Sequence, residues 1–337
     1  MRQLMFVKQG ILEWQDAHDP TLIGDVDALV RPIVVARCDL DWPIVMGLAP
    51  FRGPFPFGHE FIGEVTAIGD EVSSVEVGQL VIVPFQISCG QCKNCNRGIS
   101  NSCESVPGHS HYGLGRDSRE WGGALADWVR VPFADGMLVP LPQGIDPVHV
   151  ASASDNLPDA WRTVGPFLTE NADTNVLIVG GGAASIGLYA AGMAKALGAA
   201  QVDYLDNDPE RLKLAEAAGI NVIESLPPKS AGQYGITVDA SADQDGLMCA
   251  LRSVEPGGVC TSVGIYYQDA MVPLLDMYRT GMTFMTGRVN AREAIPSVLK
   301  LVQEGKLRPE LFTTLVADWE DAPQAMMERT TKVVIKR

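Results

Sequence analysis

The sequence predicts a β domain joined to an α/β domain, the latter built on a doubly wound parallel sheet. Three observations support this fold class. At 337 residues the chain is longer than one hydrophobic core usually organises. Residues 1 to about 150 hold short apolar runs broken by glycine, proline and aspartate, a pattern typical of strands and turns. From Asn175 onward short apolar strands alternate with helical stretches, which is the order of a parallel sheet with helices on both faces.

In the first half, each expected strand is bounded by residues that favour turns. The clearest strand candidates cover residues 28–35, 63–68 and 79–83. Turns are expected at Gly69 with Asp70 and at Val77 with Gly78. The sequence therefore predicts a barrel-like domain here, with its strands separated by glycine-containing turns.

In the second half, four apolar runs are separated by stretches long enough for helices. The expected strands cover residues 176–179, 202–205, 236–238 and 259–263. A last helix over about 291–304 and a terminal strand over 332–335 are expected to return to the first domain.

The composition limits the classes of partner. The formal charge of −15 argues against nucleic acid or an anionic membrane surface as the main partner. Because the net charge repels phosphate, a phosphate-bearing ligand needs a local group that attracts it. Arg2 and Lys8 interrupt the first residues, no secretory signal is visible, and no apolar run approaches the ~18 residues of a membrane span. Four of the seven cysteines lie between residues 89 and 103, which favours metal binding over disulfides. We expect a reduced, cytoplasmic protein.

The four clustered cysteines have the spacing of a metal site. Cys89, Cys92 and Cys95 follow one another at intervals of three on a glycine-bearing loop, and Cys103 can close a tetrahedron. Four thiolates leave no open position on a zinc ion, so such a site is structural. The alternative is a set of free thiols or a redox cluster.

A second metal site is suggested by His59, which follows a glycine and precedes Glu60. If the upstream Cys38 and the downstream Asp155 converge on it, the three side chains leave an open fourth position, which is what a catalytic zinc needs. Each residue also has an ordinary interpretation. Cys38 can fill the core, His59 can be a hydrogen-bonded structural residue, and Asp155 can cap a helix that starts near Pro158.

A dinucleotide site is predicted where the 176–179 strand runs into a glycine-rich turn at 180–187. Glycines let the backbone approach a pyrophosphate, and the following helix offers its N-terminal amides. Asp206 ends the next strand and can accept the adenosine ribose hydroxyls, while Asn207 follows it with no basic residue beside it in sequence. This favours NAD over NADP. The alternative is a domain of this fold that binds no dinucleotide. The candidate contacts are Gly180, Gly182, Ser185, Ile186, Gly187, Asp206, Asn207, Arg211, Val263 and Gly264.

These residues together resemble the medium-chain, zinc-dependent alcohol dehydrogenase family over essentially the whole chain. The resemblance implies a GroES-like catalytic domain over residues 1–154, with a structural-zinc lobe at 89–103. It implies a Rossmann NAD-binding domain over residues 155–288 and a C-terminal return over residues 289–337.

The resemblance also implies roles at the catalytic zinc. Cys38 and His59 match the first two ligands, and Glu60 matches a carboxylate that can exchange with the metal ligands. Asp155, in a Ser-Asp-x-x-Pro loop like that of the formaldehyde dehydrogenase branch, matches the third ligand. Asp41 matches an acid that orients the ligand histidine and so fixes its tautomer.

The implied activity is zinc-dependent transfer of a hydride between an alcohol, aldehyde or ketone and NAD, with two zinc ions per chain. The family's proton relay is absent, because Leu40 and Pro43 stand where a hydroxyl residue and a histidine are usual. Water, Glu60, His109 and His111 are candidates to replace it, although spacing supports none of them.

Two other functions remain open at the level of sequence. One is a zinc-free NADPH-dependent reductase of activated alkenes or quinones, and the other is a non-catalytic NAD-binding protein. The expected partner is a small alcohol or carbonyl compound, with neither nucleic acid nor membrane. The resemblance further implies a homodimer or homotetramer, with residues 258–263 and the segment near Met285 at the dimer edge.

Overall fold

The computed structural model describes all 337 residues and divides into two compact units. The first unit comprises Met1–Pro158, Val289–Gln303 and Thr313–Arg337, and the second comprises Asp159–Arg288 and Glu304–Phe312. The sequence places the whole of 289–337 with the first domain, whereas residues 304–312 group with the second unit. The Phe312 ring explains this, because it packs edge-on against Tyr189 of the second unit at 5.8 Å between ring centroids.

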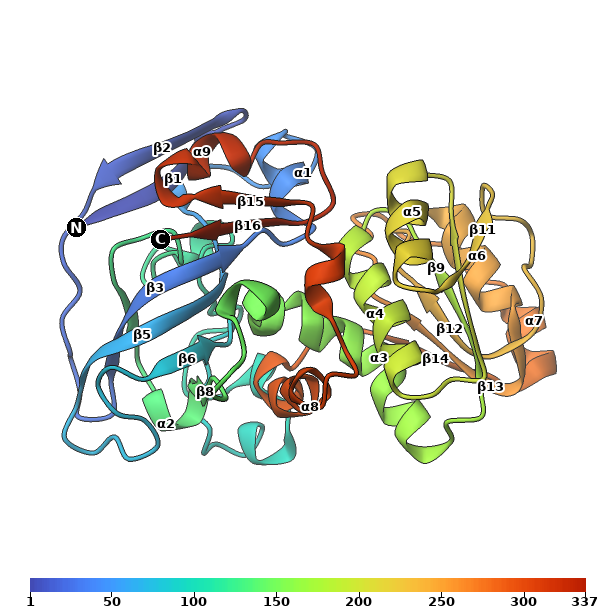
Figure 1. Cartoon of the computed structure of the whole chain (residues 1–337), viewed down its shortest axis with the longest axis horizontal. Helices are drawn as coiled ribbons and strands as arrows, with labels where there is room; N and C mark the ends of the chain where they lie inside the picture. Colours follow the sequence, from blue (N-terminus) through green and yellow to red (C-terminus); the bar gives the residue numbers. More distant parts are fainter. The chain divides into compact units, whose positions relative to one another are not determined.

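The first unit is built on two β-sheets (Figure 1). In the larger sheet β7 pairs with β3, and the other strands follow the order β15-β16-β3-β5-β6-β8. Its strands are β3 (Ala28–Ala36), β5 (Glu60–Ile68), β6 (Leu80–Val83), β7 (Val129–Val131), β8 (Val139–Pro140), β15 (Leu315–Asp318) and β16 (Val333–Lys336). The smaller sheet has the order β2-β1-β4 and comprises β1 (Arg2–Lys8), β2 (Ile11–Asp16) and β4 (Phe55–Pro56). The helices of this unit are α1 (Asp41–Val45), α2 (Ala134–Met137), α8 (Ala291–Gln303) and α9 (Ala322–Ala325).

Alternation along the strands builds the core of the first unit. In β1, Leu4 and Phe6 are buried while their neighbours are partly exposed, as expected for a strand with one face on a core. These side chains join Phe55, Phe57 and Phe61 in one apolar cluster. The cluster forms a rigid support for the residues that precede and follow β3 and β5.

The C-terminal strand β16 lies between β15 and β3. It pairs antiparallel to β3, with Val334 opposite Ala36 and Ile335 opposite Val35. The residue before β16, Lys332, is thereby brought to the end of β3, where Arg37 and Cys38 follow.

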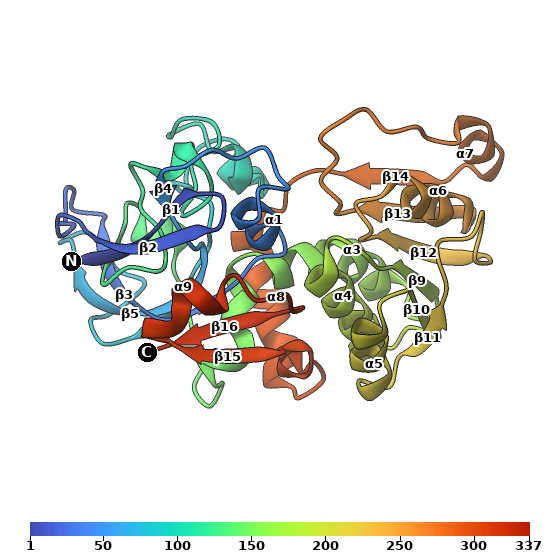
Figure 2. The same cartoon turned by 90° about the horizontal axis from the view of Figure 1, so that it is seen from above.

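The second unit contains a six-stranded parallel sheet in the order β11-β10-β9-β12-β13-β14. Its strands are β9 (Asn175–Val179), β10 (Gln201–Asp206), β11 (Asn221–Glu224), β12 (Tyr234–Asp239), β13 (Val254–Ser262) and β14 (Thr283–Thr286). The associated helices are α3 (Asn156–Glu170), which begins in the first unit, α4 (Ala184–Ala196), α5 (Pro209–Ala217), α6 (Gln244–Arg252) and α7 (Leu274–Thr280). Helices α4 and α5 cover one face of the sheet and α6 the other (Figure 2).

One expectation about this sheet is wrong. Residues 258–263 cannot form a dimer edge, because β13 is hydrogen-bonded to β12 on one side and to β14 on the other. The two edge strands of this sheet are β11 and β14, and β14 contains Met285. Separately, no helix in the structure has both the length and the apolarity to cross a bilayer.

Candidate functional site

The four cysteines of the 89–103 loop come together in the first unit. Their sulfur atoms all lie within 4.8 Å of one another, and 3.9 Å separates Cys92 Sγ from Cys103 Sγ. Zinc–sulfur bonds of about 2.3 Å at tetrahedral angles place sulfurs about 3.8 Å apart, so this spacing fits zinc. None of the seven cysteines forms a disulfide. The loop therefore has the donor set and the dimensions of a closed, four-thiolate zinc site.

Backbone N–H groups of the same loop point at these sulfurs. The N–H of Cys92 donates to Cys89 Sγ at 3.3 Å, and the N–H of Cys89 donates to Cys103 Sγ at 3.3 Å. The N–H of Cys95, donating to Cys92 Sγ, is the main cause that lowers the pKa of Cys92 to about 6. Such donors stabilise thiolates, which are the form that binds a metal.

The loop is tied to helix α8 of the same unit. Ser100 donates to Glu293 at 2.6 Å, and the N–H of Asn101 donates to Asn290 Oδ1 at 3.1 Å. A metal bound by the four cysteines would thus stiffen the attachment of α8 as well as the loop itself.

A second group of donors forms at the ends of β3 and β5. Cys38 follows β3, His59 and Glu60 stand at the start of β5, and Asp155 ends the 3₁₀ helix over Pro147–Ser154. One ligand atom from each of the four lies within 4.8 Å of the others, and all four residues are buried. The structure therefore brings together the three segments on which the sequence-based hypothesis depends, with Glu60 among them.

The imidazole of His59 is held between two carboxylates. Its Nε2 lies 3.3 Å from Asp155 Oδ2, and its Nδ1 lies 3.6 Å from Asp41 Oδ1. Neither Nδ1 nor Asp41 Oδ1 has a hydrogen-bond partner, and both are buried. Asp41 is itself fixed, because its Oδ2 accepts the N–H of Cys38 at 3.0 Å. Hence Nε2 faces the donor group, and the Asp41 carboxylate faces Nδ1, where it favours a proton on that nitrogen.

The same carboxylates set the protonation of the site. Burial would lower the pKa of His59, but Asp41 and Asp155 outweigh it and raise that pKa to about 9. Burial raises the pKa of the Cys38 thiol well above its usual value, and the carboxylates nearby raise it further. Without a cation in its centre this group therefore retains protons that a divalent metal would displace.

Glu60 has a partner that sequence spacing gave no means to find. Lys332 Nζ donates to Glu60 Oε2 at 2.9 Å and to the carbonyl of Arg37 at 2.7 Å, and both side chains are fully buried. Burial raises the pKa of Glu60 to about 7, although Lys332 opposes the rise. Asp41 aside, three anionic donors, one divalent cation and this ammonium group sum to a formal charge of zero. The donor set therefore fits zinc.

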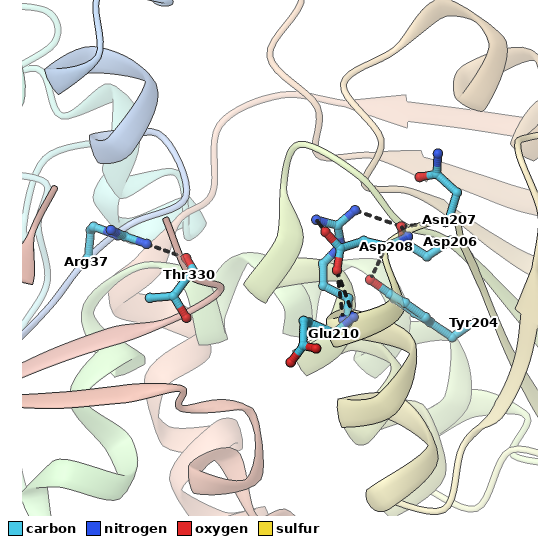
Figure 3. Close-up of polar contacts among 8 residues, drawn as sticks. Arg37, Tyr204, Asp206, Asn207, Asp208, Glu210 and Thr330 are labelled. Carbon is cyan, nitrogen blue, oxygen red and sulfur yellow. Dashed lines mark hydrogen bonds and ion pairs between the residues drawn. The ribbon is translucent and has the colours of Figure 1, made fainter. Parts of the chain in front are cut away.

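Arg37 clamps the segment that carries Lys332. Its guanidinium is buried and donates to three carbonyl groups, those of Met326, Glu328 and Thr330. Figure 3 shows the contact with Thr330. Trp42 adds a fourth tie, since its indole N–H donates to the carbonyl of Met327 at 3.1 Å. The residues on either side of Cys38 are thus anchored to the stretch before β16.

The family's proton relay is absent from the positions where it is usual, as the sequence indicates. Leu40 packs against the apolar cluster of the first unit and supplies no hydroxyl. His111 is one of the candidates to replace the relay, and its Nδ1 is buried without a partner. Burial, with a smaller contribution from His59, lowers the pKa of His111 to about 4, so its imidazole is neutral at ordinary pH. His109 is exposed on the same loop.

The predicted dinucleotide loop follows β9 in the second unit. Gly182 and Ala183 donate their N–H groups to Ser241 and Ala240, and α4 begins at Ala184. Gly181 has a φ of 151°, a conformation that favours glycine. The two predicted contacts Val263 and Gly264 lie directly after β13, at the same carboxyl edge of the sheet.

Asp206 ends β10 and is the most heavily hydrogen-bonded carboxylate of this region. Its Oδ2 accepts from the Tyr204 hydroxyl at 2.9 Å, and its Oδ1 accepts the N–H groups of Asn207 and Asp208 at 2.7 and 3.0 Å (Figure 3). Arg211 adds a bidentate pair, with Nε and Nη2 each 2.7 Å from a carboxylate oxygen. The sequence argument for NAD assumed that no basic residue lies beside this carboxylate. That premise is wrong in the folded chain, because the first turn of α5 places Arg211 in contact with Asp206.

The comparisons with known proteins agree with this arrangement. Residues 24–143 match the model of the alcohol dehydrogenase GroES-like domain, and residues 185–304 match that of the zinc-binding dehydrogenase. A probable zinc-binding alcohol dehydrogenase of Mycobacterium tuberculosis is 30% identical over 326 residues, which cover 93% of this chain and 82% of that protein.

A solved structure is similar over the whole length. The alcohol dehydrogenase TADH from Thermus sp. ATN1 has a TM-score of 0.87 and 29% identity, covering 100% of this chain and 99% of that one. The formaldehyde dismutase of Pseudomonas putida is 35% identical over 203 residues, 58% of this chain and 50% of that protein. These similarities confirm the predicted fold class, a GroES-like domain with a Rossmann domain.

Proposed function

The chain belongs to the zinc-binding alcohol dehydrogenase family of oxidoreductases, and we propose that it transfers a hydride between a small alcohol or carbonyl compound and NAD. The observation that carries this proposal is the buried group of Cys38, His59, Glu60 and Asp155, with Asp41 behind the histidine. In a protein that only binds a dinucleotide, or in a reductase that acts on alkenes without a metal, these buried donors would have no metal to bind. The zinc-free reductase and the non-catalytic binding protein are accordingly not favoured.

Two zinc ions per chain are part of the proposal. Cys38, His59 and Asp155 would hold the catalytic zinc, with Glu60 exchanging as a fourth donor, and the four cysteines of the 89–103 loop would hold the structural one. When bound, the catalytic zinc supplies a Lewis acid for the substrate oxygen and NAD supplies the hydride acceptor.

The residues of the chain perform the remaining tasks. The Asp41 carboxylate faces Nδ1 of His59 and would accept a hydrogen bond from Nδ1–H, which keeps the proton on Nδ1 and leaves the Nε2 lone pair free for a metal. Lys332 holds Glu60 by a charged hydrogen bond and thereby competes with a metal for that carboxylate. Leu40 supplies no hydroxyl at the position of the usual relay, so the substrate proton has to leave by another route.

A hydrated aldehyde is a second candidate substrate. The Asp155 loop resembles that of formaldehyde-oxidising enzymes, and the similarity to formaldehyde dismutase supports this candidate over part of the chain. A hydrated aldehyde would lose a hydride from carbon to NAD and one hydroxyl proton to solvent, giving the carboxylic acid.

We also propose a homodimer formed through β14. This strand is one of the two edge strands of the parallel sheet, and Met285 on it is exposed. Nearby exposed apolar side chains lie on α7 and the preceding loop; they include Met271, Leu274, Leu275 and Tyr278. Pairing of two β14 strands would cover this edge. The seven free cysteines support a reducing, cytoplasmic location.

The decisive experiment is a zinc count per chain by elemental analysis, on wild type and on Asp155→Ala purified without chelator. We expect two zinc ions in wild type and one in the variant, with oxidation of mixed alcohols by NAD only in wild type. Asp159→Ala is the control, since this nearby acid pairs with Arg162 and lies outside the donor group. One zinc in both proteins would overturn the proposed mechanism.

A further inference from the structure

One polar side chain beside the metal-binding group has no task in the proposed function, that of His111. Its Nδ1 is buried and has no hydrogen-bond partner. Buried side-chain nitrogen atoms are nearly always hydrogen-bonded, so an unpartnered one in a native fold indicates a water or a ligand. The imidazole is neutral, because burial lowers its pKa to about 4, and a neutral imidazole offers one N–H donor and one lone pair.

A short ladder places His111 next to the metal-binding group. The backbone of His111 bridges antiparallel to that of Gln86, and the following N–H, from Tyr112, donates to the Phe85 carbonyl at 2.9 Å. The Phe85 ring packs against the ring of His59, with 5.5 Å between the ring centroids. His111 is therefore held next to a residue whose side chain contacts a candidate metal ligand.

Two glycines make a second tie between the same segments. A Cβ on Gly113 would lie 1.7 Å from the carbonyl oxygen of Gly58, so the two backbones are in direct contact. Gly58 immediately precedes His59, and Gly113 follows His111 by two residues. The segment that carries His111 is thus fixed against the segment that carries the ligand histidine, within one compact unit.

His111 lies close to the donor group without belonging to it. The charge of His59 reaches His111, where it adds to the effect of burial on the pKa of the imidazole. The donor group itself consists of four other residues, whose ligand atoms lie within 4.8 Å of one another. A metal held by those donors would take one oxygen of the substrate, and the His111 imidazole is placed to meet a different atom of the same molecule.

Several side chains of the neighbouring segments are apolar. Phe85 is buried, and Leu40 and Leu114 are half-buried against the apolar cluster of the first unit. Asp117, which also acts on the pKa of His111, is exposed to solvent on the same loop. In such surroundings one polar group selects among substrates, because it binds a hydroxyl group and is left unpaired by an analogue that lacks one.

We propose that His111 binds a second hydroxyl group of the substrate, on the carbon next to the one that is oxidised, so that the enzyme prefers vicinal diols to simple alcohols. This inference rests on the proposed function and names the substrate class of the same site. A vicinal diol loses a hydride to NAD and one hydroxyl proton to solvent, which gives an α-hydroxy ketone, and its second hydroxyl group is unchanged. His111 is thereby assigned to substrate binding and not to the missing proton relay.

The test compares butane-2,3-diol with butan-2-ol, which differ by the one hydroxyl group that His111 would bind. The measured quantity is the ratio of kcat/KM for the two alcohols with NAD, because loss of folded or zinc-loaded enzyme lowers both values alike. His111→Phe keeps a ring but removes both nitrogen atoms, so the preference for the diol falls about tenfold, the scale of one hydrogen bond. His111→Gln keeps a donor and an acceptor and retains part of the preference.

A control variant and a measurement without turnover complete the test. His18→Phe removes an exposed imidazole from the same unit and leaves the ratio unchanged. Calorimetric titration of each alcohol into the protein with NADH measures binding alone, because NADH cannot accept a hydride. In His111→Phe the Kd for the diol rises about tenfold and that for butan-2-ol stays the same. Far-UV circular dichroism and zinc content are measured on every variant.

The outcomes separate this inference from the proposed function. If wild type oxidises the alcohols but does not prefer the diol, or if His111→Phe leaves the ratio unchanged, the inference is overturned while the dehydrogenase remains. If His111→Phe weakens the oxidation of hydrated propanal and not that of the diol, the second oxygen belongs to the reacting carbon, which overturns the assignment to vicinal diols. If wild type neither binds nor oxidises any of the three compounds, the proposed function fails and takes the inference with it.

Discussion

Replacing Lys332 by Met tests the buried ion pair that supports the metal-binding group. The ammonium and the Glu60 carboxylate are 2.9 Å apart and both fully buried. At an effective dielectric constant of about 20, two charges at this distance attract by roughly 6 kcal/mol. Removing one partner of such a pair costs about 3–5 kcal/mol, since the other charge stays buried without compensation. We expect a loss near 3 kcal/mol in the zinc-loaded protein, because a bound zinc supplies part of the lost positive charge.

The assay is urea unfolding followed by tryptophan fluorescence. Five of the six tryptophans, namely Trp14, Trp42, Trp121, Trp128 and Trp319, belong to the unit that contains the pair, so the signal reports that unit. The matched control is Arg31→Met. Arg31 pairs with Glu64 of the same strand β5 at 3.0 Å, but both side chains are exposed, so this loss stays below about 1 kcal/mol.

Two results would refute the reasoning. Equal destabilisation by Lys332→Met and Arg31→Met would mean that Glu60 is not held as an anion by Lys332. A double variant Glu60→Gln with Lys332→Met that is no more stable than Lys332→Met alone would mean that the uncompensated carboxylate is not the source of the loss.

Three further predictions concern the two candidate sites. Asp41→Asn replaces the charged acceptor beside His59 with a neutral amide, so the affinity of the catalytic zinc falls about 10- to 100-fold, measured by competition with a chromophoric chelator, while the structural zinc is retained; an unchanged affinity would remove Asp41 from the site. The pKa of His59, raised from 6.5 to about 9, gives the metal-free fold a stability that is present below pH 6.5 and lost as pH rises through about 9, so proton competition with zinc weakens over this window. Zinc affinity therefore rises about tenfold per pH unit for this proton alone, and a flat profile between those values would contradict the assignment. Gly180→Ala pushes a methyl group into the Asp206 carboxylate, so NADH binding weakens at least tenfold with an unchanged zinc count; normal NADH binding would show that this contact is not required.

The fold was largely predictable because its two patterns are local. The glycine- and proline-broken runs of the first half, and the βα alternation of the second, each reflect the periodicity of the elements that they form. The dimer-edge expectation for residues 258–263 failed because strand order is not local. Nothing in the sequence of β13 indicates that β14 pairs outside it.

The donor residues of the candidate sites were also predictable, since cysteine, histidine and aspartate carry recognisable chemistry. The residues that hold these donors in place were not predictable. Lys332 and Arg37 stand in stretches with no metal-binding pattern, and they reach the site only because β16 pairs with β3. Arg211 contacts Asp206 only because the first turn of α5 brings residues five apart in the sequence together. The residues next to Asp206 in the sequence therefore gave no sign of the positive charge beside it.

The insertion of β16 beside β3 has a consequence for biosynthesis. Once Asp155 has been made, the growing polypeptide already has all four donors, yet Lys332, the cation for Glu60, is still more than a hundred residues from being made. A nascent chain at that stage holds an uncompensated cluster of acids beside a thiol. Glu60 gains its cation only when Lys332 has been made and β16 has added to the sheet, so a chain cut before β16 keeps its ligands but lacks this ion pair.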